Sequence, residues 1–305
     1  MVLDTSPVNS MAGKRKDVSL LAARQKQKMP PCVLTIAGSD SGAGAGIQAD
    51  LKTLAALDVY GLTALTAVTA QNSRAVERAE VLPAALVGAQ VDAVLQDFPV
   101  DVIKTGMLGN AAIVEAVAAK IKRYGITKTV VDPVMVAKSG DHLLEEAALR
   151  ALQEKLLPLA LVITPNIPEA EVLCGWPIGD EKARREAAYF LHRQGPAFVL
   201  LKGGHFQEEA AEITDVLFDG EKFFYYRAPR IITGNTHGTG CTFAAAIAAQ
   251  LARGKAVPLA VKAARDYLQM IMPHGLQLGR GHGPLNHFYG CRTGRQAQEN
   301  GPLWW

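Results

Sequence analysis

The sequence predicts an α/β fold in which a parallel sheet carries helices on both faces. Short apolar runs of strand length alternate with longer segments in which apolar residues recur at helical spacing. This alternation is typical of βαβ units, whose connections place helices over a parallel sheet. The chain has 305 residues, of which 49% are hydrophobic. It is long enough for one large domain or two small ones, and apolar enough to fill a core.

In the first half of the chain, the alternation begins near Pro31. The helix expected at 46–57 repeats Ile47, Leu51 and Leu54 at positions i, i+4 and i+7. In order, the expected elements are a strand at 33–37, the helix at 46–57, a β-rich segment at 62–68, an apolar pair at 81–82 that leads into a helix entered at Pro83, a strand at 102–105, a helix at 111–123 and a strand at 129–131.

In the second half, the alternation continues and then includes a hairpin. Asp219-Gly220 is a turn dipeptide between two β-rich runs, which predicts that strands 213–218 and 223–227 pair. In order, the expected elements are a helix at 145–156, a strand at 161–164, a helix at 183–193, a strand at 198–201, the hairpin, and two long helices at 240–251 and 257–272.

Charge sets the first thirty residues apart from the rest of the chain. Residues 1–30 hold six Lys or Arg and two Asp, so the remainder is nearly neutral. We predict a flexible basic leader at 1–30, with a targeting presequence as the alternative, one domain at 31–290, and a C-terminal tail at 291–305. The near-neutral body and an aromatic content of 6% argue against nucleic-acid binding.

Two further patterns bear on location and metal content. No apolar run reaches the roughly 18 residues of a membrane span, and the N-terminus has no secretory signal. The four cysteines are far apart and form no CxxC pair, which predicts reduced thiols rather than a zinc site or a disulfide framework. We therefore expect a cytoplasmic protein without a membrane or nucleic-acid partner.

Polar and glycine-rich segments follow the expected strands, where α/β sheets bind their ligands. The segment 38–46 has four glycines in nine residues and runs into a helix N-terminus, which favours close approach of a negatively charged ligand. It lacks the GxGxxG spacing, and the chain contains no GxxxxGK[ST], so a dinucleotide fold and a P-loop are not indicated. The small polar cluster at 69–73 could hydrogen-bond a polar heterocycle.

Two strand ends offer ligands for a cation or for phosphate. Asp132 follows a strand directly and could hold Mg²⁺. Asn166 and Glu169 lie three residues apart at a helix entry, on one face. Lys202 adds a positive charge after the strand at 198–201.

The strongest chemical signal is the segment 233–242, which runs into an apolar helix. The backbone N–H groups of Gly238, Thr239, Gly240 and Cys241 are expected to converge on one point, where the helix dipole adds positive potential. This arrangement stabilises the charge of a phosphoryl group in transfer. A thiol at a helix N-terminus is also expected to have a lowered pKa.

Together these segments resemble the hydroxymethylpyrimidine/phosphomethylpyrimidine kinases of the ribokinase-like superfamily. The resembling pieces are 35–50 (TIAGSDSGAGAGIQAD), 69–73 (TAQNS), 104–108 (KTGML), 131–140 (VDPVMVAKSG), 163–169 (ITPNIPE), 201–205 (LKGGH), 235–242 (NTHGTGCT) and the ending 281–288 (GHGPLNHF). The resemblance implies a three-layer αβα sandwich with a central, mostly parallel sheet, and a homodimer.

The resemblance also implies roles for individual residues. For the substrate, it assigns Gln71 to the pyrimidine, with Gly38, Asp50 and Met107 lining the same pocket. For the nucleotide, it assigns Asn166, Lys202, Thr233 and Arg265, the last at a position where the family often has Lys. For Mg²⁺, it assigns Asp132 and Glu169. For catalysis, it assigns Gly238, Thr239, Gly240 and Cys241.

The implied activity is transfer of phosphoryl from ATP, with Mg²⁺, to 4-amino-5-hydroxymethyl-2-methylpyrimidine and then to its monophosphate. Cys241 stands where most ribokinase-like enzymes have an Asp that acts as general base. The thiolate could accept the substrate proton, or the N–H groups could carry most of the effect. The alternatives for the whole protein are a pyridoxal kinase and a heterocycle-binding or regulatory protein without catalysis.

Overall fold

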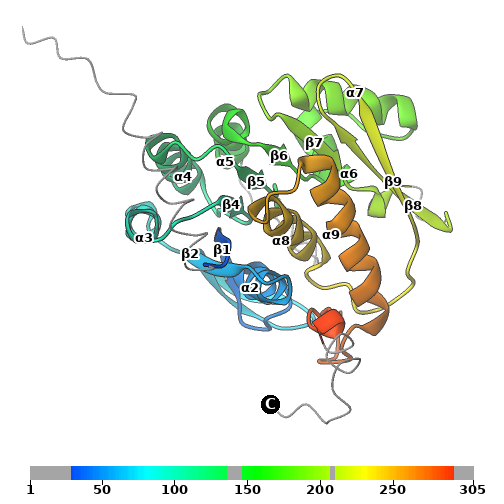
Figure 1. Cartoon of the computed structure of the whole chain (residues 1–305), viewed down its shortest axis with the longest axis horizontal. Helices are drawn as coiled ribbons and strands as arrows, with labels where there is room; N and C mark the ends of the chain where they lie inside the picture. The colour runs from blue at the N-terminus through cyan, green and yellow to red at the C-terminus, as the bar shows by residue number, and fades with distance from the viewer. Residues whose placement is uncertain (1–28, 136–145, 207–209, 292–305) are drawn as a thin grey trace, which may run out of the picture. The chain divides into compact units, whose positions relative to one another are not determined.

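The computed structural model of the chain describes residues 29–135, 146–206 and 210–291. Within these ranges, nine strands form one sheet in the order β3-β2-β1-β4-β5-β6-β7-β8-β9 (Figure 1). The strands are β1 (Cys32–Asp40), β2 (Tyr60–Gln71), β3 (Val76–Val81), β4 (Val102–Thr105), β5 (Thr129–Val131), β6 (Val162–Ile163), β7 (Phe198–Leu201), β8 (Glu212–Phe218) and β9 (Phe223–Pro229).

The centre of the sheet is parallel. Strands β2, β1, β4, β5, β6 and β7 pair in parallel, so their carboxyl ends share one edge of the sheet. The antiparallel strands are β3 at one side and β8 with β9 at the other. The predicted α/β class and mostly parallel sheet are confirmed, and the hairpin lies where the sequence placed it.

Helices cover both faces of this sheet. One apolar core joins it to α3 (Ala84–Asp97), α4 (Ala111–Tyr124), α5 (Glu146–Ala151), α6 (Ile167–Cys174) and α7 (Glu181–His192). A second core joins the other face to α2 (Gly46–Ala56), α8 (Thr239–Ala252) and α9 (Val257–Ile271). Figure 1 shows α3, α4 and α5 on one side and α2, α8 and α9 on the other. This is the expected three-layer αβα sandwich.

Local signals explain where the helices begin and end. The side chain of Asn110 accepts the backbone N–H of Ile113 at the start of α4, and Gly125 ends that helix with a φ of 66°. Asp180 caps α7 in the same way, by accepting the N–H of Ala183. Caps of this kind satisfy N–H groups that have no partner inside the helix.

The helix expected at 145–156 has a different form. It is α-helical only to Ala151, continues as a π-helical turn over Leu152–Leu156, and ends in a 3-10 turn over Leu157–Leu159. Leu156, at the end of the π-helical turn, and Leu157, at the start of the 3-10 turn, are both fully buried.

The sequence does not predict strand β3. Only its last residue, Val81, belongs to an expected element, the apolar pair at 81–82. Its sequence VERAEV has no apolar alternation because almost every side chain faces solvent at the edge of the sheet. No helix within the described ranges is long and apolar enough to cross a membrane. The basic leader at 1–30 and the tail at 291–305 fall almost wholly outside the described residues, as do positions 136–140 of one motif, so the division into three parts stays a prediction.

Candidate active site

The carboxyl edge of the parallel strands gathers a carboxylate and a lysine. Asp132 directly follows β5, and its Oδ1 accepts from the Thr164 hydroxyl at 2.9 Å and from Nζ of Lys202 at 2.9 Å. A bridge between Asn166 and Lys202 extends the β6–β7 pairing and positions the lysine. Burial alone would raise the pKa of Asp132, but the charges of Lys202 and Lys104 and these hydrogen bonds hold it below its usual value.

Glu169 lies on the other side of the same lysine. Its Oε2 is 3.7 Å from Nζ of Lys202 and accepts the backbone N–H of Asn166 at 2.7 Å. The side chain of Asn166 in turn accepts the N–H of Glu169, which completes a capping box at the start of α6. Burial, with the charge of Asp132 adding to it, raises the pKa of Glu169 to about 7 against the opposing effect of Lys202.

The N-terminus of α8 faces this cluster. A Cβ atom on Gly240 would lie 3.6 Å from Nζ of Lys202 and 3.9 Å from Oδ2 of Asp132. Gly238 precedes the helix with a φ of 80°, and the Thr239 hydroxyl donates to the carbonyl of Thr236 at 2.8 Å. The structure thus brings the expected anion-binding turn beside the expected cation-binding and phosphate-binding residues, although Asp132, Glu169 and Lys202 precede Gly240 by 108, 71 and 38 positions.

The glycine-rich loop 38–46 packs directly against the segment that leads into α8. A Cβ atom on Gly238 would lie 1.8 Å from the carbonyl oxygen of Gly44, so only glycine permits this approach. Asp40 holds the loop closed, because its carboxylate accepts the backbone N–H groups of Gly44 and Ala45 at 3.0 and 2.8 Å. Nε2 of His237 lies 2.8 Å from the same carboxylate.

Gln71 lies beside this contact. One atom of its side-chain amide is 3.4 Å from Nε2 of His237, and the other is 3.3 Å from the hydroxyl of Thr69. A small pocket opens here, lined by residues 71–75, His237 and His282. Gln71 thus lines a pocket, and its contact with a heterocycle stays a prediction.

Gly38 and Met107 lie together, but Asp50 faces inward. A Cβ atom on Gly38 would lie 2.5 Å from the Met107 methyl carbon. Asp50 is 0% exposed, and its carboxylate accepts from Nζ of Lys104 at 2.8 and 3.0 Å and from the Thr35 hydroxyl at 2.5 Å. The structure therefore brings Gly38 and Met107 together, while the contact of Asp50 with a substrate stays a prediction.

The thiol of Cys241 differs from expectation. Burial raises its pKa to about 11, and the nearby carboxylates of Asp50 and Asp132 add to this effect, whereas Lys104 opposes it. The expectation of a lowered pKa is wrong, because burial and the two carboxylates raise the pKa more than Lys104 and the N–H of Gly46 lower it. The thiol is protonated near neutral pH.

Arg265 and Thr233 make no direct contact with the lysine cluster, which consists of Lys202, Asp132 and Glu169. The guanidinium of Arg265 pairs with Oδ2 of Asp215 and lies over the ring of Phe243. Oδ1 of Asp215 accepts the backbone N–H of Gly203 at 2.8 Å, so Arg265 connects to the turn after Lys202 through one carboxylate. The hydroxyl of Thr233 accepts the N–H of Asn235 at 3.2 Å in the loop ahead of α8. Their predicted nucleotide contacts remain predictions.

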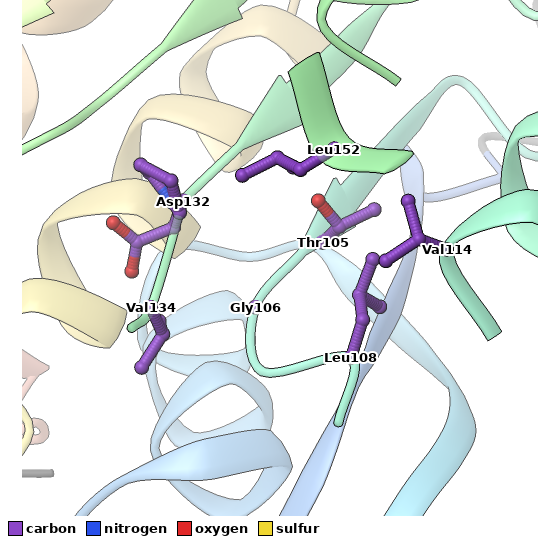
Figure 2. A pocket seen from close by; sticks show the side chains of 8 residues that line it. Thr105, Gly106, Leu108, Val114, Asp132, Val134 and Leu152 are labelled. Atoms are coloured by element: carbon purple, nitrogen blue, oxygen red, sulfur yellow. The ribbon is translucent and has the colours of Figure 1, made fainter. Parts of the chain in front are cut away.

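A second pocket lies at the ends of β4 and β5. Figure 2 shows its lining, with the Asp132 carboxylate at one side and the apolar side chains of Leu108, Val114 and Leu152 at the other. The pocket is completed by Thr105, Gly106, Pro133 and Val134. Asp132 is thus shared between the lysine cluster and this pocket.

The carboxylates suit a magnesium ion held mainly by phosphates and water. Within the described residues, no three His, Cys, Asp or Glu side chains form a metal-binding group. Asp132 and Glu169 provide two carboxylates. The hydrogen bonds described for Asp132 involve its Oδ1 and leave its Oδ2 available. Mg²⁺ in phosphoryl-transfer sites commonly takes one or two carboxylates with substrate phosphates and water, so this donor set fits.

Several residues of the site have no individual role predicted from the sequence, although most of them lie within its motifs. They are Asp40, Thr69, Lys104, Thr164, Asp215 and His237. Asp40, Thr69, Thr164 and His237 lie within the predicted motifs, where their position beside strand ends and glycines is a usable signal. Lys104 and Asp215 lie inside apolar strand patterns, where a single charged residue signals a buried partner.

Comparisons with known proteins identify the family of the chain. The family model for phosphomethylpyrimidine kinase matches residues 40–286. The chain is 49% identical over 255 residues to a hydroxymethylpyrimidine/phosphomethylpyrimidine kinase of Bacillus subtilis, covering 84% of this chain and 94% of the relative. It is 52% identical over 271 residues to a thiamine biosynthesis bifunctional protein of Geobacter sulfurreducens, covering 89% of this chain but only 55% of that protein.

A solved structure has the same fold. The pyridoxal kinase of Staphylococcus aureus in complex with AMP-PCP and pyridoxal superimposes with a TM-score of 0.79 at 34% identity, covering 87% of this chain and 96% of that one. The family match extends over most of the chain, and it includes the strand ends and the α8 turn that build the site. The chain belongs to the phosphomethylpyrimidine kinase family.

Proposed function

We propose that this protein transfers the γ-phosphoryl group of MgATP to 4-amino-5-hydroxymethyl-2-methylpyrimidine and then to the resulting monophosphate, in thiamine biosynthesis. The observation that carries the proposal is the meeting of Lys202, Asp132 and Glu169 with the N-terminus of α8. The family membership and the names of the relatives supply the substrate class.

The anion-binding turn would stabilise the transferring group. Backbone N–H groups in the first turn of α8 have no partner inside the helix, although that of Thr239 donates to the carbonyl of Thr236 ahead of it, and the helix dipole favours negative charge at this end. Lys202 adds a full positive charge that requires no rearrangement. Preorganised donors of this kind commonly contribute more to phosphoryl transfer than any other single effect.

The thiol of Cys241 would stay protonated during catalysis and would not serve as the general base. A thiol with a pKa of about 11 is a poor base at neutral pH, and the phosphates of ATP would raise that pKa further. The phosphoryl-transfer transition state is loose, so the attacking hydroxyl needs alignment more than early deprotonation. The second step, in which a phosphate attacks, needs no base.

Magnesium, assembly and location belong to the same proposal. Asp132 and Glu169 would hold a magnesium ion, which would neutralise phosphate charge when bound. The homodimer, which the family resemblance implies, and the cytoplasmic location stay predictions. The assigned roles of Asn166, Thr233 and Arg265 at the nucleotide, and of Gly38, Asp50 and Met107 at the substrate, are part of the proposal.

A pyridoxal kinase is the second candidate. Its specific support is the similarity to the Staphylococcus aureus enzyme, whose complex contains pyridoxal. Pyridoxal is also a flat heterocycle with a hydroxymethyl arm. The higher identity to hydroxymethylpyrimidine kinases, 49% against 34%, favours the pyrimidine.

The test is an ADP-release assay with MgATP that compares the hydroxymethylpyrimidine with pyridoxal, combined with mass spectrometry of the products. We expect mono- and diphosphorylated pyrimidine. A larger kcat/KM for pyridoxal would contradict the proposed substrate but not the site. Transfer to neither compound would favour a binding or regulatory protein and contradict the proposed activity.

A further inference from the structure

Gln71 is held between two groups that together decide how its side-chain amide points. In one orientation of the amide, Oε1 lies 3.3 Å from the Thr69 hydroxyl and Nε2 lies 3.4 Å from Nε2 of His237. Rotation by 180° about the last side-chain bond exchanges the oxygen and nitrogen at nearly the same positions. The neighbours therefore determine which orientation is stable.

His237 requires an acceptor. Its Nε2 lies 2.8 Å from Oδ2 of Asp40, and a carboxylate only accepts, so this ring nitrogen carries a proton whether the ring is neutral or charged. Asp40 itself is 3% exposed and is fixed by the backbone N–H groups of Gly42, Gly44 and Ala45. The amide atom of Gln71 beside His237 is therefore its oxygen.

Thr69 requires a donor. Its hydroxyl has one proton, which it donates to the carbonyl of Ser39 at 2.8 Å. Only its lone pairs remain for Gln71, so the atom beside it is the amide nitrogen. Both neighbours select the same orientation, with the oxygen toward His237 and the NH₂ group toward Thr69.

The backbone of Gln71 is fixed as well. Its N–H donates to the Ser41 hydroxyl at 2.8 Å, and that hydroxyl donates to the Gln71 carbonyl at 2.7 Å. The amide therefore retains one oxygen lone pair and one N–H for a ligand in the pocket that Gln71 and His237 line. A carboxamide edge of this kind pairs with the adjacent amino group and ring nitrogen of an aminoheterocycle.

We propose that Asp40, His237 and Thr69 are positioning residues that fix the polarity of the Gln71 amide and so select a 4-aminopyrimidine over its 4-oxo counterpart. The inference rests on the proposed function for the identity of the ligand. The aminopyrimidine offers a donor and an adjacent acceptor, which the fixed amide matches. The 4-oxo compound reverses that pair, so it would bind only when turned over, with its hydroxymethyl arm displaced.

The same network couples ring orientation to the site of transfer. His237 immediately precedes Gly238, the residue at which the anion-binding turn begins, and Gly238 contacts Gly44 of the loop that Asp40 holds. The residues that orient the heterocycle and those that stabilise phosphoryl charge are therefore joined by direct contacts. A heterocycle that is oriented by Gln71 therefore also presents its hydroxymethyl arm to the anion-binding turn that begins at Gly238.

The test is titration calorimetry of the hydroxymethyl aminopyrimidine and of its 4-oxo analogue, with the wild type and with His237→Phe, His237→Gln and Thr69→Val. We expect the wild type to prefer the aminopyrimidine by about 100-fold, because a reversed donor–acceptor pair leaves polar groups unpaired. The preference should fall to about 10-fold or less in His237→Phe and Thr69→Val, since the amide can then rotate. His237→Gln should keep most of it, because an amide NH₂ can still donate to both partners.

The ratio separates positioning from a general structural effect. Equal weakening of both ligands in His237→Phe, with the preference intact, would overturn the inference. If that variant does not fold, an unchanged preference in Thr69→Val would do the same. His274→Phe, at an exposed histidine that stacks on Tyr289, is the matched control and should behave as the wild type. Because binding is measured, the selectivity can be established even if no phosphoryl transfer occurs.

Discussion

At the scale of single residues, Cys241 shows that burial, rather than position in the sequence, determines the protonation state of a thiol. Its place in the first turn of α8 suggests an activated thiolate, yet the surrounding desolvation raises the pKa to about 11. At pH 8, about one thiol in a thousand would be ionised. Phosphate binding would reduce that fraction further.

We predict that Cys241→Ser keeps kcat within about tenfold of the wild type, because the backbone N–H groups and Lys202 remain in place. The measurement is kcat from pH 6 to 9 for both proteins.

We also expect iodoacetamide to alkylate Cys241 slowly at pH 8. Peptide mass spectrometry measures the rate, with the exposed Cys291 as the reference thiol. A loss of a thousandfold or more in kcat would show that the thiolate is the base after all.

Individual residues also mark the limit of what sequence alone predicts. Strand ends placed Asp132, Glu169 and Lys202 correctly at one edge, because parallel strands share their carboxyl ends. The partner of Asp40 is His237, which is 197 positions away, and no local pattern specifies such a pair. Arg265 likewise pairs with Asp215, 50 positions earlier.

At the scale of elements, helix α8 joins the second core to the site. Every residue from Thr242 to Leu251 is buried, so the helix is anchored on all sides, whereas its first turn is only half-buried. Gly240 lies in that turn, where a Cβ atom would meet Lys202 and Asp132 only at ordinary contact distances. A methyl group can therefore be added there without steric strain.

We predict that Gly240→Asp lowers kcat/KM for MgATP by at least about 100-fold, because a carboxylate would occupy the anion-binding turn and pair with Lys202. The melting temperature should not fall, since a negative charge in the first turn suits the helix dipole. Activity and thermal unfolding are measured on the same preparation, and Gly240→Ala is the control for added volume alone. Wild-type turnover in Gly240→Asp would remove the anion-binding role from α8.

Helices and strands differ in how well their positions can be predicted from the sequence. Strands β4, β5 and β7 have the bounds predicted, because each is a short buried apolar run between polar ends. Strand β3 lacked any such contrast, and the π-helical turn at Leu152–Leu156 depends on tertiary packing of neighbouring leucines. Periodicity thus locates elements that separate core from solvent and misses those defined by their neighbours.

At the scale of the whole fold, the end of the described chain returns to the start of α8. Pro284 forms a bridge with His237, and the buried ring of His287 has its Nε2 3.0 Å from the Thr242 hydroxyl. The Tyr267 hydroxyl on α9 donates to the carbonyl of His287 at 2.7 Å. The closing segment therefore supports both the anion-binding turn and the second core.

This packing gives the protein a specific sensitivity to acid. Burial, with the charge of Lys52 adding to it, lowers the pKa of His287 to about 4 from an ordinary 6.5. The unfolded chain therefore takes up a proton at higher pH than the folded one. The stability that the neutral ring contributes is complete above pH 6.5 and is lost as the pH falls toward 4, an effect of about 3 kcal/mol.

We predict that His287→Gln is less stable than the wild type at pH 7.5, and that the difference in unfolding free energy shrinks by up to about 3 kcal/mol between pH 7.5 and 4. The wild type alone has this buried imidazole to protonate, so only its stability falls for this reason in acid. Urea unfolding followed by tryptophan fluorescence and circular dichroism at several pH values gives the difference directly. His274→Gln, at an exposed ring, should follow the wild type at every pH. A constant difference between His287→Gln and the wild type would mean that His287 titrates alike in both states, and that its contact with Thr242 contributes packing alone.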